Sequence, residues 1–121
     1  MTPEERLLDN VIDMEEAARE AIESLEEVSL GELEQDLLHQ RAVATTFVLL
    51  ATAAARIQTL FPDIASEQPE TAWSKIQGLR NLVVHQYDRL DWRIIWETVQ
   101  SYLPKLVRQI DQLRHPHIQG E

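Results

Sequence analysis

Residues 42–55 read AVATTFVLLATAAA and form the longest stretch without a charged residue in the 121-residue chain. Arg41 and Arg56 bracket this stretch, which makes it shorter than the roughly 20 residues needed to span a bilayer. Apolar residues continue at helical spacing on both sides, and small residues between 42 and 55 make the helix apolar on more than one face. The pattern predicts a long buried helix at the centre of a bundle or at a subunit interface.

Helix signals before and after this stretch predict an all-α domain of four helices. Thr2 is a predicted N-cap, followed by Pro3 at the first helical position, for a first helix that reaches about Val28. Ser29 then caps the central helix, which we expect to continue without a break to Leu60.

The second half of the chain carries the other two predicted helices. Residues 62–71 read as an extended loop, and a short third helix starts at about Trp73. Asp91 is a good N-cap for the fourth helix, in which Pro104 predicts a kink because it removes a backbone hydrogen bond. We predict a single domain over residues 1–114 and a frayed tail over residues 115–121.

The charge distribution is uneven. Residues 1–40 hold thirteen acids and two bases, a net charge of −11, and the remaining 81 residues hold eight acids and nine bases, a net charge of +1. Since phosphate contacts dominate affinity for nucleic acid, RNA binding is expected only on the second half. The N-terminal acids are explained either as a solvated helix face or as a docking surface for a basic partner.

The composition also restricts the chemistry and the compartment. The chain has no cysteine, which excludes disulfides, a thiolate metal site and a cysteine nucleophile. The N-terminus lacks the pattern of a signal peptide. These features predict a cytoplasmic protein that is not associated with a membrane.

Two features are weaker candidates for a site. His115 and His117 are two ligands in a predicted tail and do not make a closed metal shell, so no metal is expected. Of the three tryptophans, at 73, 92 and 96, core packing is the expected role, and base stacking by Trp92 is the sharper alternative. Candidate RNA contacts around the motif below are Lys75, Arg89, Trp92 and Arg93.

The segment Arg80–Tyr87 places three functional groups near the end of a helix. Asn81 and His85 are four apart, so the amide can reach the imidazole and set its tautomer. An imidazole can take the proton of a ribose 2′-hydroxyl or give one to the leaving oxygen, while a guanidinium stabilises the charge on the phosphorane. The spacing alone equally fits a helix-end histidine bonded to a carbonyl and an arginine paired with an acid.

The pattern Arg80-x4-His85-x-Tyr87 resembles the R-x4-H-x-Y signature of HepT toxins in the HEPN superfamily. The resemblance covers most of the chain and is specific between Gly78 and Pro104, with Leu79, Leu90-Asp91 and Trp96 also matching. It departs from the family at residues 51–55, which read ATAAA where relatives often have Gly-Glu-Ala, and at Asp88, where an aromatic residue is frequent.

The resemblance implies an antiparallel four-helix bundle that forms a homodimer, with both motifs facing one cleft. It implies a metal-independent endoribonuclease that needs no cofactor and acts on RNA, tRNA included. Arg80 and His85 become the catalytic pair and Asn81 a supporting residue. Tyr87 becomes the acceptor of AMP from an MntA-type nucleotidyltransferase, the antitoxin of the pair, and AMP there would block the cleft by charge and bulk.

Two alternatives remain open from the sequence. The chain could be a non-catalytic HEPN module that scaffolds its nucleotidyltransferase, which the acidic first half and Asp88 favour. It could also be an unrelated bundle in which the motif is accidental, and a monomer with Arg80 and His85 far apart or buried would favour that explanation.

Overall fold

A computed structural model describes the backbone of residues 1–119 and the side chains of all of these except residues 70, 71 and 115–119. The described part is helical throughout, with no strand. The helices in chain order are α1 (Pro3–Ser24), α2 (Leu30–Gln35), α3 (Leu37–Leu60), α4 (Pro62–Ala65), α5 (Glu70–Gln86), α6 (Trp92–Glu97) and α7 (Leu103–Gln119).

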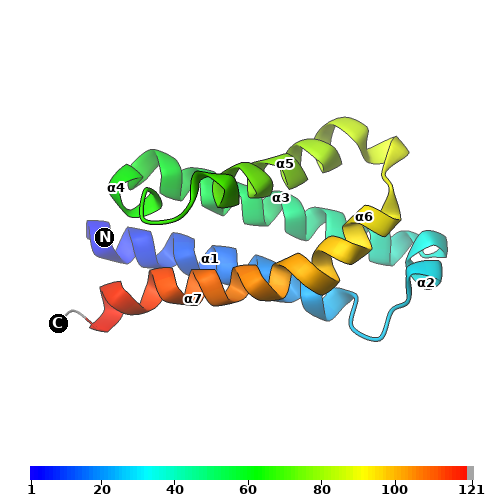
Figure 1. Cartoon of the computed structure of the whole chain (residues 1–121), viewed down its shortest axis with the longest axis horizontal. Coiled ribbons are helices and arrows are strands. Elements are labelled where there is room, and N and C mark those ends of the chain that lie inside the picture. The colour runs from blue at the N-terminus through cyan, green and yellow to red at the C-terminus, as the bar shows by residue number, and fades with distance from the viewer. Residues whose placement is uncertain (120–121) are drawn as a thin grey trace.

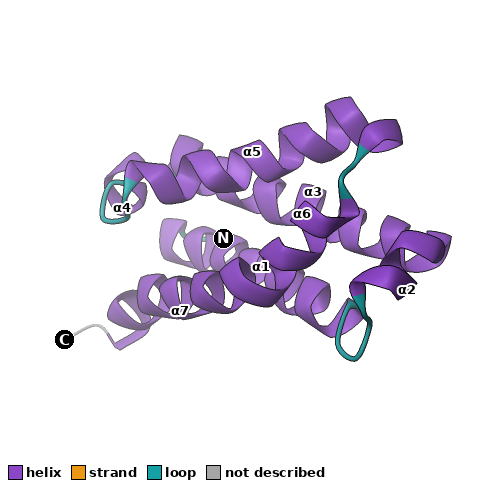
Figure 2. Cartoon of the chain, turned by 45° about the vertical axis from the view of Figure 1, so that its right-hand side comes forward, coloured by secondary structure: helices purple, strands orange, loops and turns teal. Residues whose placement is uncertain are grey.

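Four long helices form an up-and-down bundle, which confirms the predicted all-α fold (Figure 1). α1 and α5 run in one direction and α3 and α7 in the other, so the chain reverses at each end of the molecule. α3 packs against both α1 and α5, and α1 also packs against α7. The short helices α2 and α4 cap opposite ends, as Figure 2 shows from a second side.

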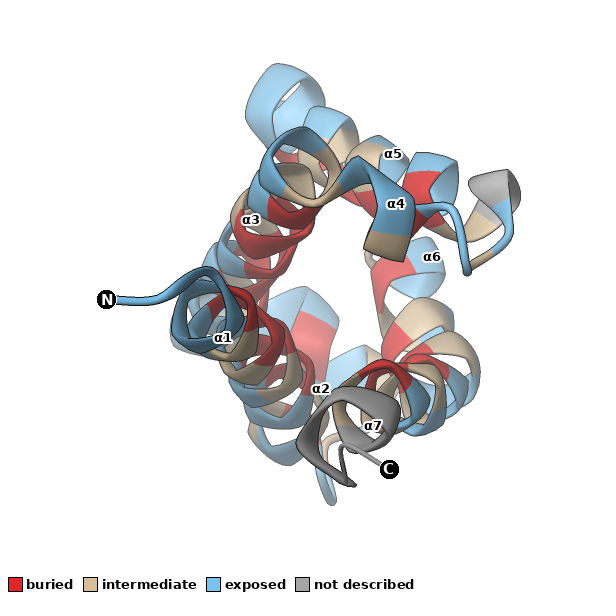
Figure 3. Ribbon diagram, turned by 90° about the vertical axis from the view of Figure 1, so that its left-hand side faces the viewer, coloured by how far each residue is buried: buried red, intermediate tan, exposed pale blue. Residues whose placement is uncertain are grey.

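The core lies along the bundle axis, where buried residues of all four long helices turn inward (Figure 3). The largest fully buried side chains include Phe47, Leu50 and Ile57 of α3 and Met14 of α1. α3 is long and apolar enough to cross a membrane by length and composition alone, and half of its most apolar window is buried inside the bundle. The predicted role of residues 42–55 as a central buried helix is thus confirmed for one side of α3.

The helix caps follow the sequence signals closely. Thr2 Oγ1 accepts a hydrogen bond from the Glu5 amide at 3.1 Å, and Asp91 Oδ1 accepts one from the Arg93 amide at 3.0 Å. Such caps satisfy amides that have no partner within the first helical turn. α1 nevertheless ends at Ser24, four residues before the predicted Val28, in a turn where Glu27 has a φ of 63°.

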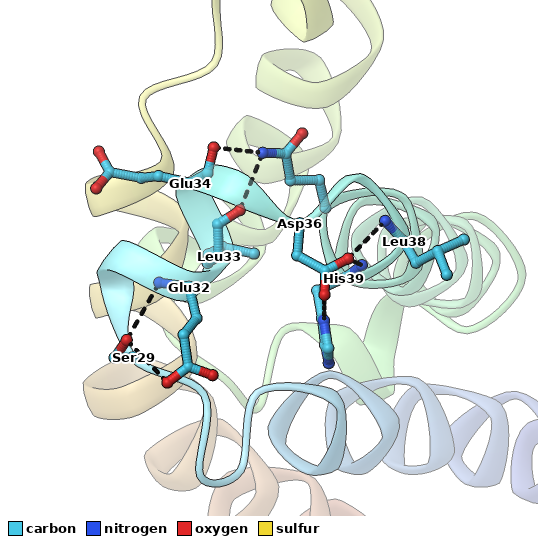
Figure 4. Close-up of polar contacts among 8 residues, drawn as sticks. Ser29, Glu32, Leu33, Glu34, Asp36, Leu38 and His39 are labelled. Carbon is cyan, nitrogen blue, oxygen red and sulfur yellow. Dashed lines mark hydrogen bonds and ion pairs between the residues drawn. The ribbon is translucent and has the colours of Figure 1, made fainter.

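The predicted unbroken helix from Ser29 to Leu60 is wrong, because Asp36 divides it into α2 and α3. Figure 4 shows this junction: Asp36 Oδ1 accepts from the Leu38 and His39 amides, and its Oδ2 lies 2.6 Å from His39 Nδ1. The Gln40 side chain reaches back and donates to the carbonyls of Leu33 and Glu34, at 2.9 and 3.2 Å. One carboxylate therefore starts α3, while an amide from α3 closes the end of α2.

Three further boundaries differ from the sequence prediction. The expected loop after Leu60 contains the single turn α4, and α5 begins at Glu70, earlier than the predicted Trp73. α7 continues to Gln119, so the helix extends beyond residue 115, and residues 120 and 121 lie outside the described part. The structure is thus more helical at its ends and turns than the sequence pattern indicated.

The expected kink near Pro104 takes the form of a π-helical turn over Thr98–Tyr102, between α6 and α7. The Leu103 amide bonds to the Thr98 carbonyl, five residues back. A π turn absorbs the register change that a proline imposes on the next helical turn. α6 accordingly leans away from the line of α7 toward α2 (Figure 1).

The core packing predicted for the three tryptophans is confirmed, because Trp73 is buried and Trp92 and Trp96 are partly buried against the core. Trp73 is 4% exposed and its Nε1 donates to the Ala65 carbonyl at 2.8 Å, which fixes α4 against α5. Trp96 Nε1 donates to the Val28 carbonyl at 2.9 Å and so ties α6 to the turn after α1. Trp73 thus fixes the start of α5, and Trp96 fixes α6, the helix that follows the motif turn.

Candidate functional site

The motif residues lie on the last turns of α5 and on the turn that follows it. α5 ends at Gln86, whose φ of −132° and ψ of 24° leave the helix, and Tyr87–Arg89 form a 3-10 turn before α6. The motif thus lies at the end of a helix, as predicted from the sequence. Since the backbone bends there, Tyr87 is free to take a direction that a continuous helix would not give it.

Arg80 is half-buried and lines an open groove between α3 and α5. Its Nη1 lies 3.5 Å from Asn81 Oδ1, at the limit of a hydrogen bond. Arg80 makes no ion pair with any described residue. A guanidinium carries five N–H donors, so most of its capacity to bind an anion remains open toward the groove.

His85 is exposed and makes no contact with Arg80 in the same chain. Five helical residues correspond to a rotation of about 140°, which points the two side chains in different directions from α5. Asn81 could reach His85 at this spacing, but its side-chain oxygen faces Arg80 in this structure. Within one chain, the Arg80 guanidinium and the His85 imidazole therefore lie close in sequence but are not aimed at the same point.

Tyr87 is 37% exposed and lines a second hollow between α3 and α5, together with Arg41 and Val83. Its ring stands edge-on to Trp92, with 6.2 Å between ring centroids and 85° between ring planes. This T-shaped contact holds the ring without covering it. Trp92 is half-buried, and its ring already packs against Tyr87. Base stacking by Trp92 stays a prediction.

The other candidate RNA contacts differ in how available they are. Lys75 Nζ lies 4.1 Å from the centroid of the Tyr102 ring, a cation–π contact toward the π-helical turn. Burial raises the pKa of the Tyr102 hydroxyl, so the tyrosine stays neutral beneath this cation. Arg89 and Arg93 are exposed at the end of the site that α6 borders. Their contact with RNA stays a prediction.

The cations that α3 contributes were not predicted from the sequence. Arg56 lines the same groove as Arg80, and Arg41 lines the same hollow as Tyr87. The only signal was that these two arginines interrupt an otherwise apolar helix at its two ends. The side chains of His115 and His117, the discounted metal pair, lie outside the described residues. In the part of the chain that is described, no three histidine or acidic side chains gather as metal ligands.

An up-and-down helical bundle that carries an Arg-x4-His-x-Tyr motif beside an open groove defines a protein of the HEPN class. A scan against family models matches residues 14–113 to the family described as "Ribonuclease HepT-like". The chain belongs to the HepT-like ribonuclease family, which confirms the resemblance stated from the motif.

Relatives of similar length support the assignment. The chain is 29% identical over 106 residues to "Probable ribonuclease HepT" of Thermococcus cleftensis, covering 84% of this chain and 94% of that protein. It is 24% identical to "Putative RNase MJ1380" of Methanocaldococcus jannaschii, over 82% of this chain and 88% of the relative. A third, "Putative RNase TTE0752" of Caldanaerobacter subterraneus, is 27% identical over 76% and 80%. No solved structure is similar enough to count as a match.

Proposed function

We propose that this protein is a metal-independent endoribonuclease of the HepT toxin type, acting on cytoplasmic RNA, with tRNA as a candidate substrate. The observation that carries the proposal is the complete Arg80-x4-His85-x-Tyr87 motif, with an unpaired guanidinium at an open groove and an exposed imidazole one and a half turns later. Membership of a family described as ribonucleases supports the same activity.

The two side chains supply what cleavage of RNA by its own 2′-hydroxyl requires. The neutral imidazole of His85 accepts the 2′-hydroxyl proton, the 2′-oxygen attacks phosphorus, and the bond from phosphorus to the 5′-oxygen breaks. Arg80 stabilises the charge on the phosphorane oxygens, and the leaving oxygen takes up a proton. The products are a 2′,3′-cyclic phosphate and a free 5′-hydroxyl, and the reaction is balanced without a metal or cofactor.

The active form we propose is a homodimer, because one chain does not aim both groups at one phosphate. Five large apolar side chains on α3 and α5 are left in water by a single chain: Leu37 at 52%, Leu38 at 78%, Leu49 at 50%, Leu60 at 47% and Val84 at 47% exposed. Exposed apolar side chains of this size favour association. Pairing two copies through α3 and α5 would bring Arg80 of one chain toward His85 of the other.

Regulation by a nucleotidyltransferase partner of the MntA type is part of this proposal. Tyr87 is the acceptor, and its partly exposed ring beside Arg41 supports that role. Transfer of AMP forms a bond from the tyrosine oxygen to the α-phosphorus of ATP and releases pyrophosphate. The added phosphate would compete with RNA phosphate for the arginines of the groove.

A non-catalytic module that scaffolds the nucleotidyltransferase is the second candidate. The separation of Arg80 from His85 within one chain favours it. A mixing experiment separates the two candidates. Arg80→Ala and His85→Ala are each expected to lose cleavage of purified tRNA, with or without EDTA, by about 100-fold or more. Co-refolding the two inactive variants should restore part of the activity, since one composite site per mixed dimer is intact.

Three outcomes are decisive. Rescue in the mixture supports a site shared between two chains. If both single variants are inactive and the mixture shows no rescue, the shared site is contradicted, but the ribonuclease proposal stands. A wild type that cleaves no RNA, or a His85→Ala variant as active as wild type, would remove the ribonuclease proposal and favour the scaffold.

A further inference from the structure

The groove that contains Arg80 holds a second arginine from another helix. Arg56 of α3 and Arg80 of α5 line one open groove of about 480 Å³, although they are 24 residues apart in sequence. The rest of the lining is Ala51, Thr52, Ala55, Thr59 and Leu60 from α3 and Gln77 from α5, so it is small or polar except for Leu60 at its end. Two guanidiniums therefore face one volume of solvent, at the side of α3 that packs on α5.

Arg56 is exposed and makes no ion pair with a described residue. Acids are nevertheless near, because Asp13, Glu16 and Glu20 of α1 line the hollow on the other side of the same arginine. Arg56 thus stands on the border between an acidic hollow and a cationic groove. A polyanion that enters the groove is attracted by both arginines and repelled beyond Arg56 by the three carboxylates.

The lining of the groove indicates which part of an RNA strand it can bind. None of its lining residues is aromatic, so the groove offers no ring on which a base could stack. Thr52 donates its hydroxyl to the Val48 carbonyl at 2.8 Å, which leaves only its acceptor lone pairs. What remains for a ligand is two guanidiniums, the Thr59 hydroxyl and the Gln77 amide, a set that suits phosphate and ribose oxygens.

We infer that Arg56 binds a backbone phosphate of the substrate RNA next to the phosphate held by Arg80. The strand then runs along the seam between α3 and α5, with the acidic side of α1 as its boundary. The second hollow, lined by Arg41 of α3 and by Val83 and Tyr87, lies between the same two helices, so the seam continues toward Arg41. This inference rests on the proposed function, since it names an additional substrate-binding residue of that site.

The test uses single-stranded RNA and measures both cleavage and binding, the latter by fluorescence anisotropy on the His85→Ala protein. Arg56→Gln should raise KM about tenfold, as expected for one lost charge-assisted phosphate contact, and change kcat less than about threefold. The slope of log affinity against log salt should fall by about 0.7, the value for one phosphate of a single strand. Arg56→Lys should have a KM and a salt slope between those of the wild type and Arg56→Gln, because lysine keeps the charge but loses the bidentate geometry of the guanidinium.

Arg108→Gln is the matched control, since it removes an exposed arginine from α7, on a different helix. It should leave KM, kcat and the salt slope unchanged. An Arg56→Gln protein that matches the control in KM and salt slope overturns the inference, while Arg80→Ala still reports on the proposed function. An Arg56→Gln protein that becomes monomeric by size-exclusion chromatography, where the wild type is dimeric, also overturns it in favour of an interface role.

The two proposals fail separately. If the wild type binds RNA without cleaving it and Arg56→Gln weakens binding with a lower salt slope, the ribonuclease proposal falls and the Arg56 inference stands. If the wild type binds no RNA at low salt, the inference falls as well.

Discussion

α3 has a different kind of neighbour on each side, and the comparison shows how this chain uses its few cations. α1, on one side, carries eight acids and two bases, and its Glu15 is held by Arg19 at 3.2 Å and by Arg114 of α7 at 3.5 Å. On the other side, Arg56 of α3 and Arg80 of α5 share a groove and pair with no described acid. On the α1 side, Arg114 ties α7 to α1 and Arg19 pairs within α1, while on the α5 side neither arginine pairs with a described acid.

The apolar residues of α3 divide in a second way, between the core and the solvent. Leu50 is 1% exposed in the core, while its neighbour Leu49 is 50% exposed. Adjacent residues on a helix point about 100° apart, so one face of α3 closes the core and the next stays open. A single helix thus carries both the stability of the fold and the surface on which function is proposed.

The largest expected effect separates these two faces by the same substitution at neighbouring positions. Leu50→Ala leaves a cavity in the core and should lower the free energy of unfolding by about 2–5 kcal/mol. Leu49→Ala removes no core contact and should change it by less than about 0.5 kcal/mol in dilute protein, while weakening the proposed dimer. Urea unfolding at two protein concentrations, with sedimentation to follow association, measures both.

Equal losses for the two leucine variants at every concentration would erase the distinction between the faces of α3. A dimer that survives Leu49→Ala unchanged would move the proposed interface away from this face. A concentration dependence that Leu50→Ala alone alters would reverse the assignment.

The second-largest effect is expected when the charge of Glu15, which is held by two arginines, is compared with that of Arg56, which pairs with no described acid. Glu15→Gln keeps the shape of a side chain that is 15% exposed and removes the charge that two arginines hold. It should lower the free energy of unfolding by about 1 kcal/mol. Arg56→Gln should change it by less than about 0.5 kcal/mol, because no partner is lost. Thermal unfolding at low and high salt measures the contrast, and salt should shrink the Glu15 effect.

A loss on Arg56→Gln as large as that on Glu15→Gln would mean that Arg56 is already engaged by the acids of α1. Arg56 would then be a paired cation, and the difference between the two sides of α3 would not hold for it.

The sequence predicted the parts of this structure that depend on local chemistry. Thr2, Ser29 and Asp91 were identified as caps because a cap is decided by side chains within three residues of it. The motif on α5 was found because its residues are adjacent in the chain. Trp73 and Trp96 were placed in the core because large rings at helical spacing seldom stay in water.

The missed features depend on contacts that the pattern of apolar residues does not contain. The break at Asp36 interrupts a continuous helical pattern, and it is closed by His39 on one side and by Gln40 on the other. The π turn before Pro104 replaces a simple kink for a reason of backbone register. Arg56 and Arg80 line one groove only because α3 and α5 pack antiparallel in one particular register. The 24 residues between them in the sequence do not reveal that register.

The smallest effect is expected at Asp36, the residue that joins α2 to the N-terminal end of α3. Hydrogen bonds from His39, by its side chain first and then its amide, lower the pKa of the Asp36 carboxyl below its ordinary 3.8. A lowered pKa in the folded state means that the ionised group contributes stability above its unfolded pKa, and that this contribution is lost as the pH falls through the folded pKa. The thermal midpoint of the wild type should therefore fall more steeply below about pH 4 than that of Asp36→Asn, which keeps a cap without a charge. Because every other carboxylate is common to both proteins, the difference between the two midpoints isolates this one group. Parallel curves across that range would show that the bond to His39 adds nothing to the fold, and that α2 is held to α3 by Gln40 and by packing alone.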